Sequence, residues 1–180
     1  INNPKNKILF GEDGKGDLYN YETVNSFIET IGENKCHLVT GDGGFDYSED
    51  YNSQEQSSYK LLYSEVFTAL NIQEEGGYFV LKMFDLFHYK TIQLLYLLYC
   101  HYSIIEIYKP STSRLSNSEK YIICSNFLGM KEDVRKTLID QFNTCENLKI
   151  NVPKSFIDDI NNYNEIFVSK QIEIITKVLS

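Results

Sequence analysis

Several features that would mark other classes of protein are missing from this sequence of 180 residues. Its four cysteines are widely spaced and show no CxxC or Cys/His ligand pattern: Cys36, Cys100, Cys124 and Cys145. Such spacing argues against a structural zinc site and predicts buried free thiols in a reducing compartment. We therefore expect no metal and an intracellular location, in the nucleus or the cytoplasm. No apolar run approaches the roughly 20 residues that a bilayer requires, and no secretory signal opens the chain.

Basic residues are also scarce. Lys and Arg number 17 against 25 Asp and Glu, which gives a net charge of −8. A protein that wraps nucleic acid over its whole surface needs clustered basic side chains, so the charge balance argues against this class. A narrow basic groove remains open. The sequence has no initiator Met, which is typical of a piece of a longer polypeptide.

Apolar strands alternate with amphipathic helices over the first two thirds of the chain. The strand pattern occurs at 36–40, 78–84, 103–108 and 119–124. The helical pattern occurs at 21–32, 57–72 and 90–101, and we expect Gly76 and Gly77 to end the second of these helices. The alternation predicts an α/β fold with a mostly parallel sheet. Since the last two strands lie too close together for a crossover helix, the final strand should be antiparallel.

The character of the sequence changes after Gly129. Helical patterns follow one another at 131–142, 154–161 and 164–179, without strands between them. We therefore divide the chain into a sheet-bearing part, 1–128, and a layer of C-terminal helices appended to the same domain, 129–180.

Polar residues stand where the predicted strands end, which is where α/β sheets bind ligands. Asp42 follows the first strand, Lys82 lies near the end of the second, and Glu119 opens the last. The lysine is the most informative, because a buried ammonium without partners is costly. Each residue also has a plain alternative: an edge-strand lysine that reaches solvent, ordinary turn chemistry, and a solvated carboxylate.

Three motifs in order, GDGGF, KMFDLF and KPSTSRLSNSEKYIIC, resemble those of the FtsJ-like ribose 2′-O-methyltransferases, above all the cap-1 (cap-specific mRNA nucleoside-2′-O-) methyltransferases. The resemblance runs from about residue 10 to residue 127. It implies the C-terminal portion of a Rossmann-like fold, S-adenosylmethionine as cofactor, and methylation of the first transcribed nucleotide of capped mRNA. Capped RNA and other capping-enzyme domains would be the partners. An rRNA or tRNA ribose methyltransferase and a non-catalytic scaffold in a capping complex remain alternatives.

The family's active site is a Lys–Asp–Lys–Glu tetrad. By resemblance, Asp42, Lys82 and Glu119 match its last three members, and Asp42 also borders the cofactor. Asp17, in GKGD, matches the acidic position near the adenine end of the cofactor, and we include its neighbour Leu18. The first lysine and a Gly-rich APGGF-like loop belong before residue 1, so we expect the isolated chain to be inactive.

The resemblance suggests that Lys82 is the base or the group that orients the hydroxyl, held by Asp42 and Glu119. The pKa of a free lysine is about 10.4, and it would have to fall toward neutrality for Lys82 to act as a base. Burial and a neighbouring ammonium would lower this pKa, whereas the two carboxylates would raise it.

The loop before Glu119 mixes basic and hydroxyl side chains, which suits contacts to phosphate and sugar. The residues that we expect to bind RNA there are Lys109, Ser113, Arg114 and Ser118, and Lys120 also flanks the loop. An ordinary polar surface loop is the alternative. Among the aromatic residues, we expect Tyr96 and Tyr99 to pack in the core or an interface, while His88 would border the substrate.

Overall fold

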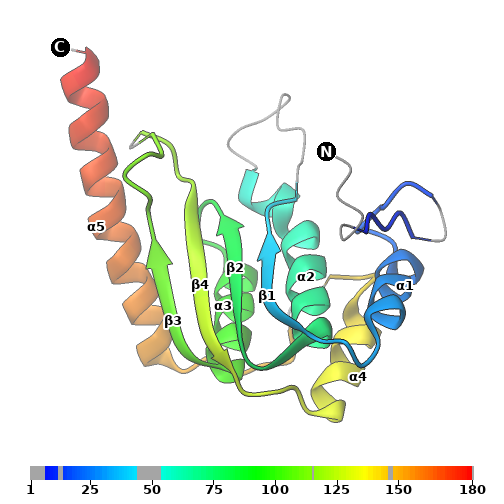
Figure 1. Cartoon of the computed structure of the whole chain (residues 1–180). Coiled ribbons are helices and arrows are strands. Elements are labelled where there is room, and N and C mark those ends of the chain that lie inside the picture. The colour runs from blue at the N-terminus through cyan, green and yellow to red at the C-terminus, as the bar shows by residue number, and fades with distance from the viewer. Residues whose placement is uncertain (1–6, 12–13, 44–53, 115, 146–147, 180) are drawn as a thin grey trace.

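The computed structural model describes residues 7–11, 14–43, 54–114, 116–145 and 148–179. Within them, a four-stranded sheet has the order β1-β2-β4-β3. Strand β1 (Cys36–Gly41) pairs in parallel with β2 (Gln73–Met83), and β4 (Lys120–Phe127) lies antiparallel between β2 and β3 (Tyr102–Tyr108). Three strands therefore run in one direction and β4 in the other, as Figure 1 shows. This confirms the predicted α/β fold with a reversed final strand.

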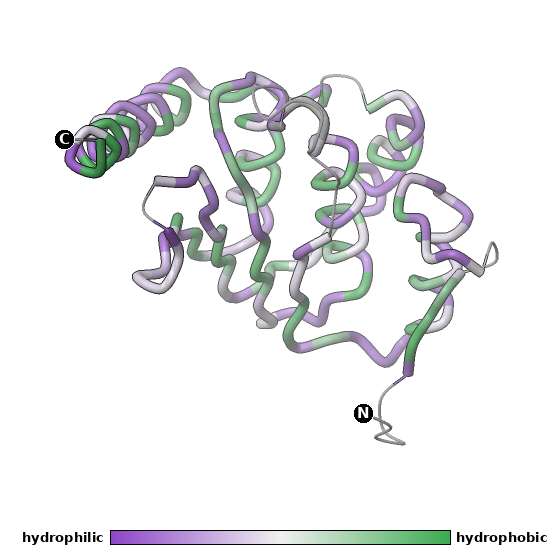
Figure 2. The backbone as a smooth tube through the Cα atoms, turned by 90° about the horizontal axis from the view of Figure 1, so that it is seen from above, coloured by the Kyte–Doolittle hydropathy of each residue, from purple (hydrophilic) through white to green (hydrophobic). Residues whose placement is uncertain are grey.

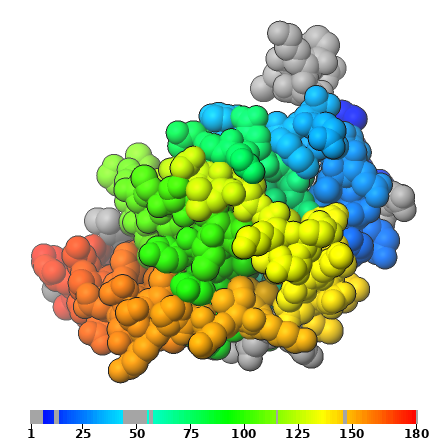
Figure 3. All heavy atoms as spheres, turned by 90° about the horizontal axis from the view of Figure 1, so that it is seen from below, coloured from blue at the N-terminus to red at the C-terminus, as the bar shows by residue number. Residues whose placement is uncertain are grey.

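The helices begin and end close to their predicted limits. They are α1 (Tyr21–Ile31), α2 (Gln54–Ile72), α3 (Tyr89–His101), α4 (Glu132–Gln141) and α5 (Lys154–Leu179). Helix α5 lies at one side of the sheet and α1 at the other (Figures 1 and 2). Seen from below, α4 and the start of α5 cover the end of the molecule opposite the carboxyl ends of β1 and β2 (Figure 3).

Two predicted boundaries were wrong. The segments 154–161 and 164–179 form one continuous helix, because the residues between them, Asn162 and Tyr163, are weak helix formers but not breakers. The Gly76-Gly77 pair does not end α2 but lies inside β2, where the register with β1 shifts. A side chain at Gly77 would meet the His37 carbonyl oxygen at 2.7 Å, so glycine permits this close approach.

The strands alternate between a buried face and a partly exposed one, as the pleat requires. On β2, the side chains of Phe79, Leu81 and Met83 are fully buried against the helices, whereas Lys82 is only partly covered. On β4, Ile122 belongs to the buried face. Helix α3 is buried along most of its length, as its apolar sequence predicted.

The four cysteines are free thiols. Cys124 and Cys145 are buried, and burial raises the pKa of Cys124 to about 12. Cys36 is half-buried, and Cys100 is exposed, which corrects the expectation that it would be buried.

None of the helices in the described ranges combines the length and the apolar character needed to cross a bilayer.

Candidate active site

Three of the predicted site residues come together at the carboxyl ends of β1 and β2, at the top of the sheet in Figure 1. The Nζ atom of Lys82 lies 2.8 Å from Oδ1 of Asp42, and Glu119 is close enough to attract the same ammonium. Strand pairing explains the arrangement. Gly41 is the parallel partner of Leu81, which places Asp42 beside Lys82, and the antiparallel pairing of β4 brings Glu119 to the same end.

The position of Lys82 excludes one of the alternatives considered for it. Strand β2 lies between β1 and β4, so Lys82 is not on an edge strand. Its side chain keeps only 25% of its surface exposed, and its ammonium pairs with a carboxylate. Lys82 is thus part of a charged cluster, rather than a lysine that reaches freely into solvent.

The pKa of Lys82 is raised, not lowered. The hydrogen bond to Asp42 is the largest cause, and the negative charges of Asp42 and Glu119 add to it, while burial opposes them. The described residues therefore hold Lys82 as an ammonium at neutral pH. In this arrangement it can donate a hydrogen bond, but it cannot accept a proton until its surroundings change.

Tyr121 is a member of the cluster that the sequence analysis missed. It is the direct antiparallel partner of Lys82, and its hydroxyl lies 3.5 Å from Oε1 of Glu119. Burial raises its pKa, and the charge of Glu119 contributes in the same direction. The signal was present in the sequence, because residues two apart on a strand share a face.

A second missed residue, Glu65 of α2, stabilises the turn that carries Asp42. Its Oε1 accepts a 2.7 Å hydrogen bond from the backbone N–H of Gly43, and burial raises its pKa. A side chain at Gly43 would approach this oxygen to 2.9 Å, which explains why glycine follows Asp42. The end of the GDGGF motif, residues 44–45, lies outside the described residues.

The loop between β3 and β4 is held together by one of its own cations. Lys109 Nζ donates to Ser113 Oγ at 3.0 Å, to the Asn117 carbonyl at 3.1 Å and to the Glu119 carbonyl at 2.6 Å. The Ser113 hydroxyl lies 3.2 Å from Glu119 Oε1. Burial lowers the pKa of Lys109, while Glu119 opposes the change. Lys109 and Ser113, predicted to bind RNA, therefore also organise the loop around Glu119.

The other predicted RNA contacts differ in exposure. Arg114 is exposed at the tip of this loop, and the half-buried Ser118 interacts with Asp85. Lys120, which also flanks the loop, is not at its surface: its side chain is 1% exposed and lies on the helix-covered face of the sheet. It therefore cannot contact RNA in this structure.

Asp17 and Leu18, the predicted cofactor contacts, precede α1. The carboxylate of Asp17 is exposed, and its Oδ1 accepts a 2.8 Å hydrogen bond from Tyr19 N. Leu18 packs against the core, and its carbonyl accepts a hydrogen bond from Ser64. Among the described residues, no hydrogen bond or ion pair joins them to Lys82.

Comparison with known proteins identifies the family of the chain. The family model described as FtsJ-like methyltransferase matches residues 1–127. The chain belongs to the FtsJ-like methyltransferase family. The match confirms the resemblance that the three motifs indicated.

Curated relatives point to one branch of this family. Cap-specific mRNA (nucleoside-2′-O-)-methyltransferase 1 of Mus musculus is 36% identical, over 93% of this chain and 22% of the mouse protein. The mouse methyltransferase 2 is 33% identical over 93% of this chain and 23% of its own length. The methyltransferase 1 of Trypanosoma brucei brucei is 33% identical over 84% of this chain and 39% of that protein. The chain thus spans about a fifth of the length of its mouse relatives.

Among solved structures, a putative ribosomal RNA methyltransferase from Plasmodium falciparum matches with 20% identity and a TM-score of 0.49. The match covers 67% of this chain and 62% of that one.

Proposed function

We propose that the protein transfers a methyl group from S-adenosylmethionine to a ribose 2′-hydroxyl of RNA, at the first transcribed nucleotide of capped mRNA. The observation that carries the proposal is the 2.8 Å contact between Lys82 and Asp42 beside Glu119, which matches three of the four tetrad positions of the family. The names of the curated relatives support the choice of capped mRNA over other RNAs. The free thiols suit the intracellular location proposed with it, the nucleus or the cytoplasm.

The residues present fit the cofactor's chemistry. S-adenosylmethionine brings a methyl group on a sulfonium, which is already electrophilic, so the protein mainly has to align donor and acceptor. The exposed carboxylates of Asp17 and Asp42 offer acceptors for hydroxyl or amino groups of this ligand, with Asp42 beside the lysine. Leu18 would line the region beside Asp17.

The chain's own groups would handle the hydroxyl. The Lys82 ammonium donates a hydrogen bond to the ribose 2′-oxygen and so fixes its position, while the Glu119 carboxylate accepts from the ribose and holds the amine. RNA that covers the site would desolvate Lys82 and lower its pKa, as would a second ammonium at the family's first lysine position. Under these conditions the ammonium would release its proton to water, and the neutral amine could then accept the proton of the 2′-hydroxyl as the oxygen takes up the methyl group.

Arg114 and the hydroxyl groups of Ser113 and Ser118 lie on the loop that ends at Glu119. We assign them, with Lys109, to contacts with RNA phosphate and sugar, which would hold the 5′ end over the site without reading bases.

The test uses the longest expressed form of the protein that contains this chain. Methyl transfer from labelled S-adenosylmethionine is measured on capped RNA, uncapped RNA and an rRNA fragment. We expect capped RNA to be methylated. Lys82→Ala should lower the rate of methyl transfer at least about 100-fold, while cofactor binding, measured by calorimetry, is retained. Lys136→Ala, on the exposed side of α4, is the matched control.

Each other outcome has a defined meaning. Preference for the rRNA fragment would favour the ribosomal or transfer RNA alternative. RNA binding without methyl transfer would favour the scaffold alternative. Full turnover in the Lys82→Ala variant would contradict the assignment of the site.

A further inference from the structure

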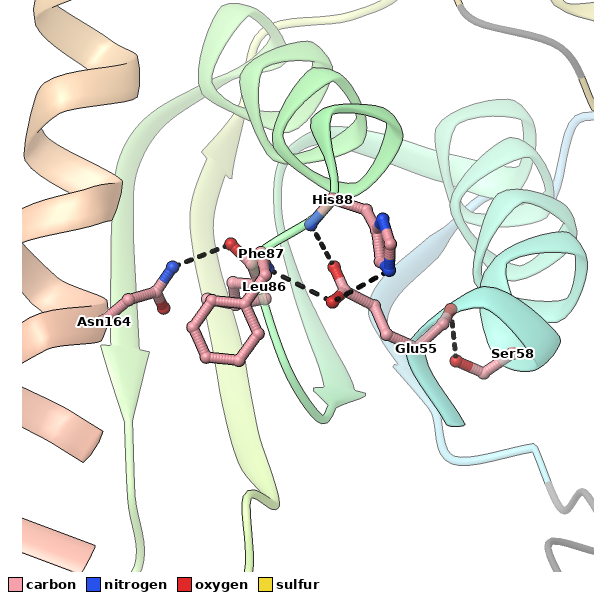
Figure 4. A network of polar contacts seen from close by, with 6 residues as sticks. All are labelled: Glu55, Ser58, Leu86, Phe87, His88 and Asn164. Carbon is pink, nitrogen blue, oxygen red and sulfur yellow. Dashed lines mark hydrogen bonds and ion pairs between the residues drawn. The ribbon is translucent and has the colours of Figure 1, made fainter. Parts of the chain in front are cut away.

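The loop that follows β2, residues 84–88, begins two residues after Lys82 and joins β2 to α3. It is held by side chains from distant elements. Glu55 of α2 is 6% exposed, and its carboxylate accepts hydrogen bonds from the N–H groups of Phe87 at 3.2 Å and His88 at 2.8 Å. Asn164 of α5 donates to the Leu86 carbonyl at 2.8 Å. Figure 4 shows these two side chains reaching the loop from opposite sides. The backbone groups in these contacts are partly or fully buried and need such partners, so each contact fixes the loop in place.

Lys120 of β4 provides the third contact. Its Nζ atom donates to the Phe84 carbonyl at 2.5 Å, and it lies 4.5 Å from the ring centroid of Phe167 on α5. The side chain is 1% exposed. One residue thus joins the strand that follows Glu119, the loop that follows Lys82, and the C-terminal helix.

Burying the Lys120 ammonium costs free energy, because the charge loses its contact with water. Burial lowers the pKa of Lys120 to about 8, and the positive charge of Lys109 acts in the same direction, while the carboxylates of Asp85 and Glu55 oppose the change. A methionine could occupy a similar volume without the desolvation of a charge. The hydrogen bond to Phe84 and the ring contact with Phe167 are what a methionine could not reproduce.

We propose that Lys120 is a positioning residue for methyl transfer: by tying the 84–88 loop and α5 to β4, it sets the place of Lys82 relative to Glu119. This inference rests on the proposed function. It also assigns a role to α5, which enters the functional unit through Asn164 and Phe167 rather than serving only as an outer layer.

The first test measures the loop without any reaction. Hydrogen exchange is followed by mass spectrometry on the wild-type chain, on Lys120→Met and on the exposed control Lys136→Met. In Lys120→Met the amides of Phe87 and His88 should exchange at least about tenfold faster, whereas β1 and α1 should keep their protection. Unchanged exchange in the loop, or an equal increase in every element, would overturn the proposal.

A second variant covers the case in which Lys120→Met does not fold. Phe167→Leu keeps the lysine and removes the ring beneath its ammonium. We expect faster exchange in the 84–88 loop in the same sense but to a smaller degree, together with faster exchange around Asn164. Protection equal to the wild type in both segments would count against the role of Lys120.

The kinetic test uses the methylation-competent form. Lys120→Met should lower kcat by about tenfold and leave the KM for S-adenosylmethionine unchanged, because the residue is buried on the opposite face of the sheet from Lys82. A loosened loop with an unchanged kcat would overturn the positioning role. If neither the wild type nor the variant methylates RNA, the proposed function fails. The hydrogen-exchange experiment needs no reaction, so it still tests whether Lys120 holds the loop.

Discussion

Two lysines on neighbouring strands lie on opposite faces of the sheet, and their pKa values shift in opposite directions. Lys82 faces Tyr121 across the β2–β4 pair, while Lys120 faces Met83, one position along the same ladder. The pleat turns them to opposite faces of the sheet, so Lys82 meets Asp42, and Lys120 meets the helix-covered core. The carboxylate raises the pKa of the first, whereas burial lowers the pKa of the second to about 8. A displacement of one residue along the ladder therefore decides the chemistry of each amine.

The largest difference between the two lysines should appear in catalysis. In the methylation-competent form, Lys82→Met should lower kcat by about 10²–10⁴-fold, since it removes a group at the reacting oxygen. Lys120→Met, with the same change of side chain, should lower it by only about tenfold. Steady-state methyl-transfer rates on capped RNA measure both. Equal losses would mean that the two lysines do not divide into a site residue and a positioning residue.

The pH dependence of stability should have opposite signs for the two lysines. The folded pKa of Lys120 lies below its unfolded value, so between about pH 8 and 10.5 the unfolded chain binds more protons, and stability rises with pH. Relative to Lys120→Met, the wild type should gain up to about 3 kcal/mol over this window. Relative to Lys82→Met it should lose stability as pH rises through the raised pKa of Lys82. Denaturant titrations of the three proteins at several pH values measure these differences, and equal slopes would contradict the contrast.

Much of this arrangement could be predicted from the sequence, and the failures have physical causes. The strand ends placed Asp42, Lys82 and Glu119 in one cluster, because polar residues interrupt apolar strands at these points. Lys120 adjoins a polar loop, which suggests a surface position, but it alternates with Glu119 on the strand and so faces the other way.

Two supporting carboxylates, Glu65 and Glu55, make contacts that short motifs do not reveal. Glu65 reaches Gly43 from a helix 22 residues away, and Glu55 reaches His88 from 33 residues away. Neither has a local sequence signature beyond a carboxylate on an apolar helix. The direction of the Lys82 pKa shift likewise depended on whether Asp42 would touch the amine, which spacing alone does not settle.

Replacing Asp42 should make Lys82 more similar to Lys120. Asp42→Asn keeps the shape of the side chain and a neutral acceptor but removes the negative charge that strengthens the bond to the ammonium, so the pKa of Lys82 should fall. Titration of ¹³C-labelled lysine side chains by NMR reports this directly, with the Lys136 resonance as an internal reference. An unchanged Lys82 titration would show that Asp42 does not control the amine.

Glu65→Leu tests how Glu65 stabilises the turn that carries Asp42. The substitution leaves the Gly43 N–H without its acceptor, and we expect a loss of about 1–3 kcal/mol in the free energy of unfolding. Glu65→Gln keeps an acceptor and removes a charge that burial disfavours, so it should lose much less. Thermal and denaturant unfolding separate the two, and equal losses would mean that the charge, rather than the hydrogen bond, holds the turn.

The smallest effect on the fold should come from replacing Arg114, which is exposed at the tip of the loop between β3 and β4. Lys109 is engaged in its own loop, whereas Arg114 is exposed at the tip, so Arg114→Ala should change stability by less than about 0.5 kcal/mol. If Arg114 contacts phosphate, the variant should bind all RNA sequences more weakly to a similar degree, and the slope of log K against log salt should shrink by about one ion. Fluorescence anisotropy at several salt concentrations measures this. A variant that changed sequence preference instead would show that the loop reads bases. The role of Arg114 would then be the recognition of RNA sequence and not the binding of the RNA backbone.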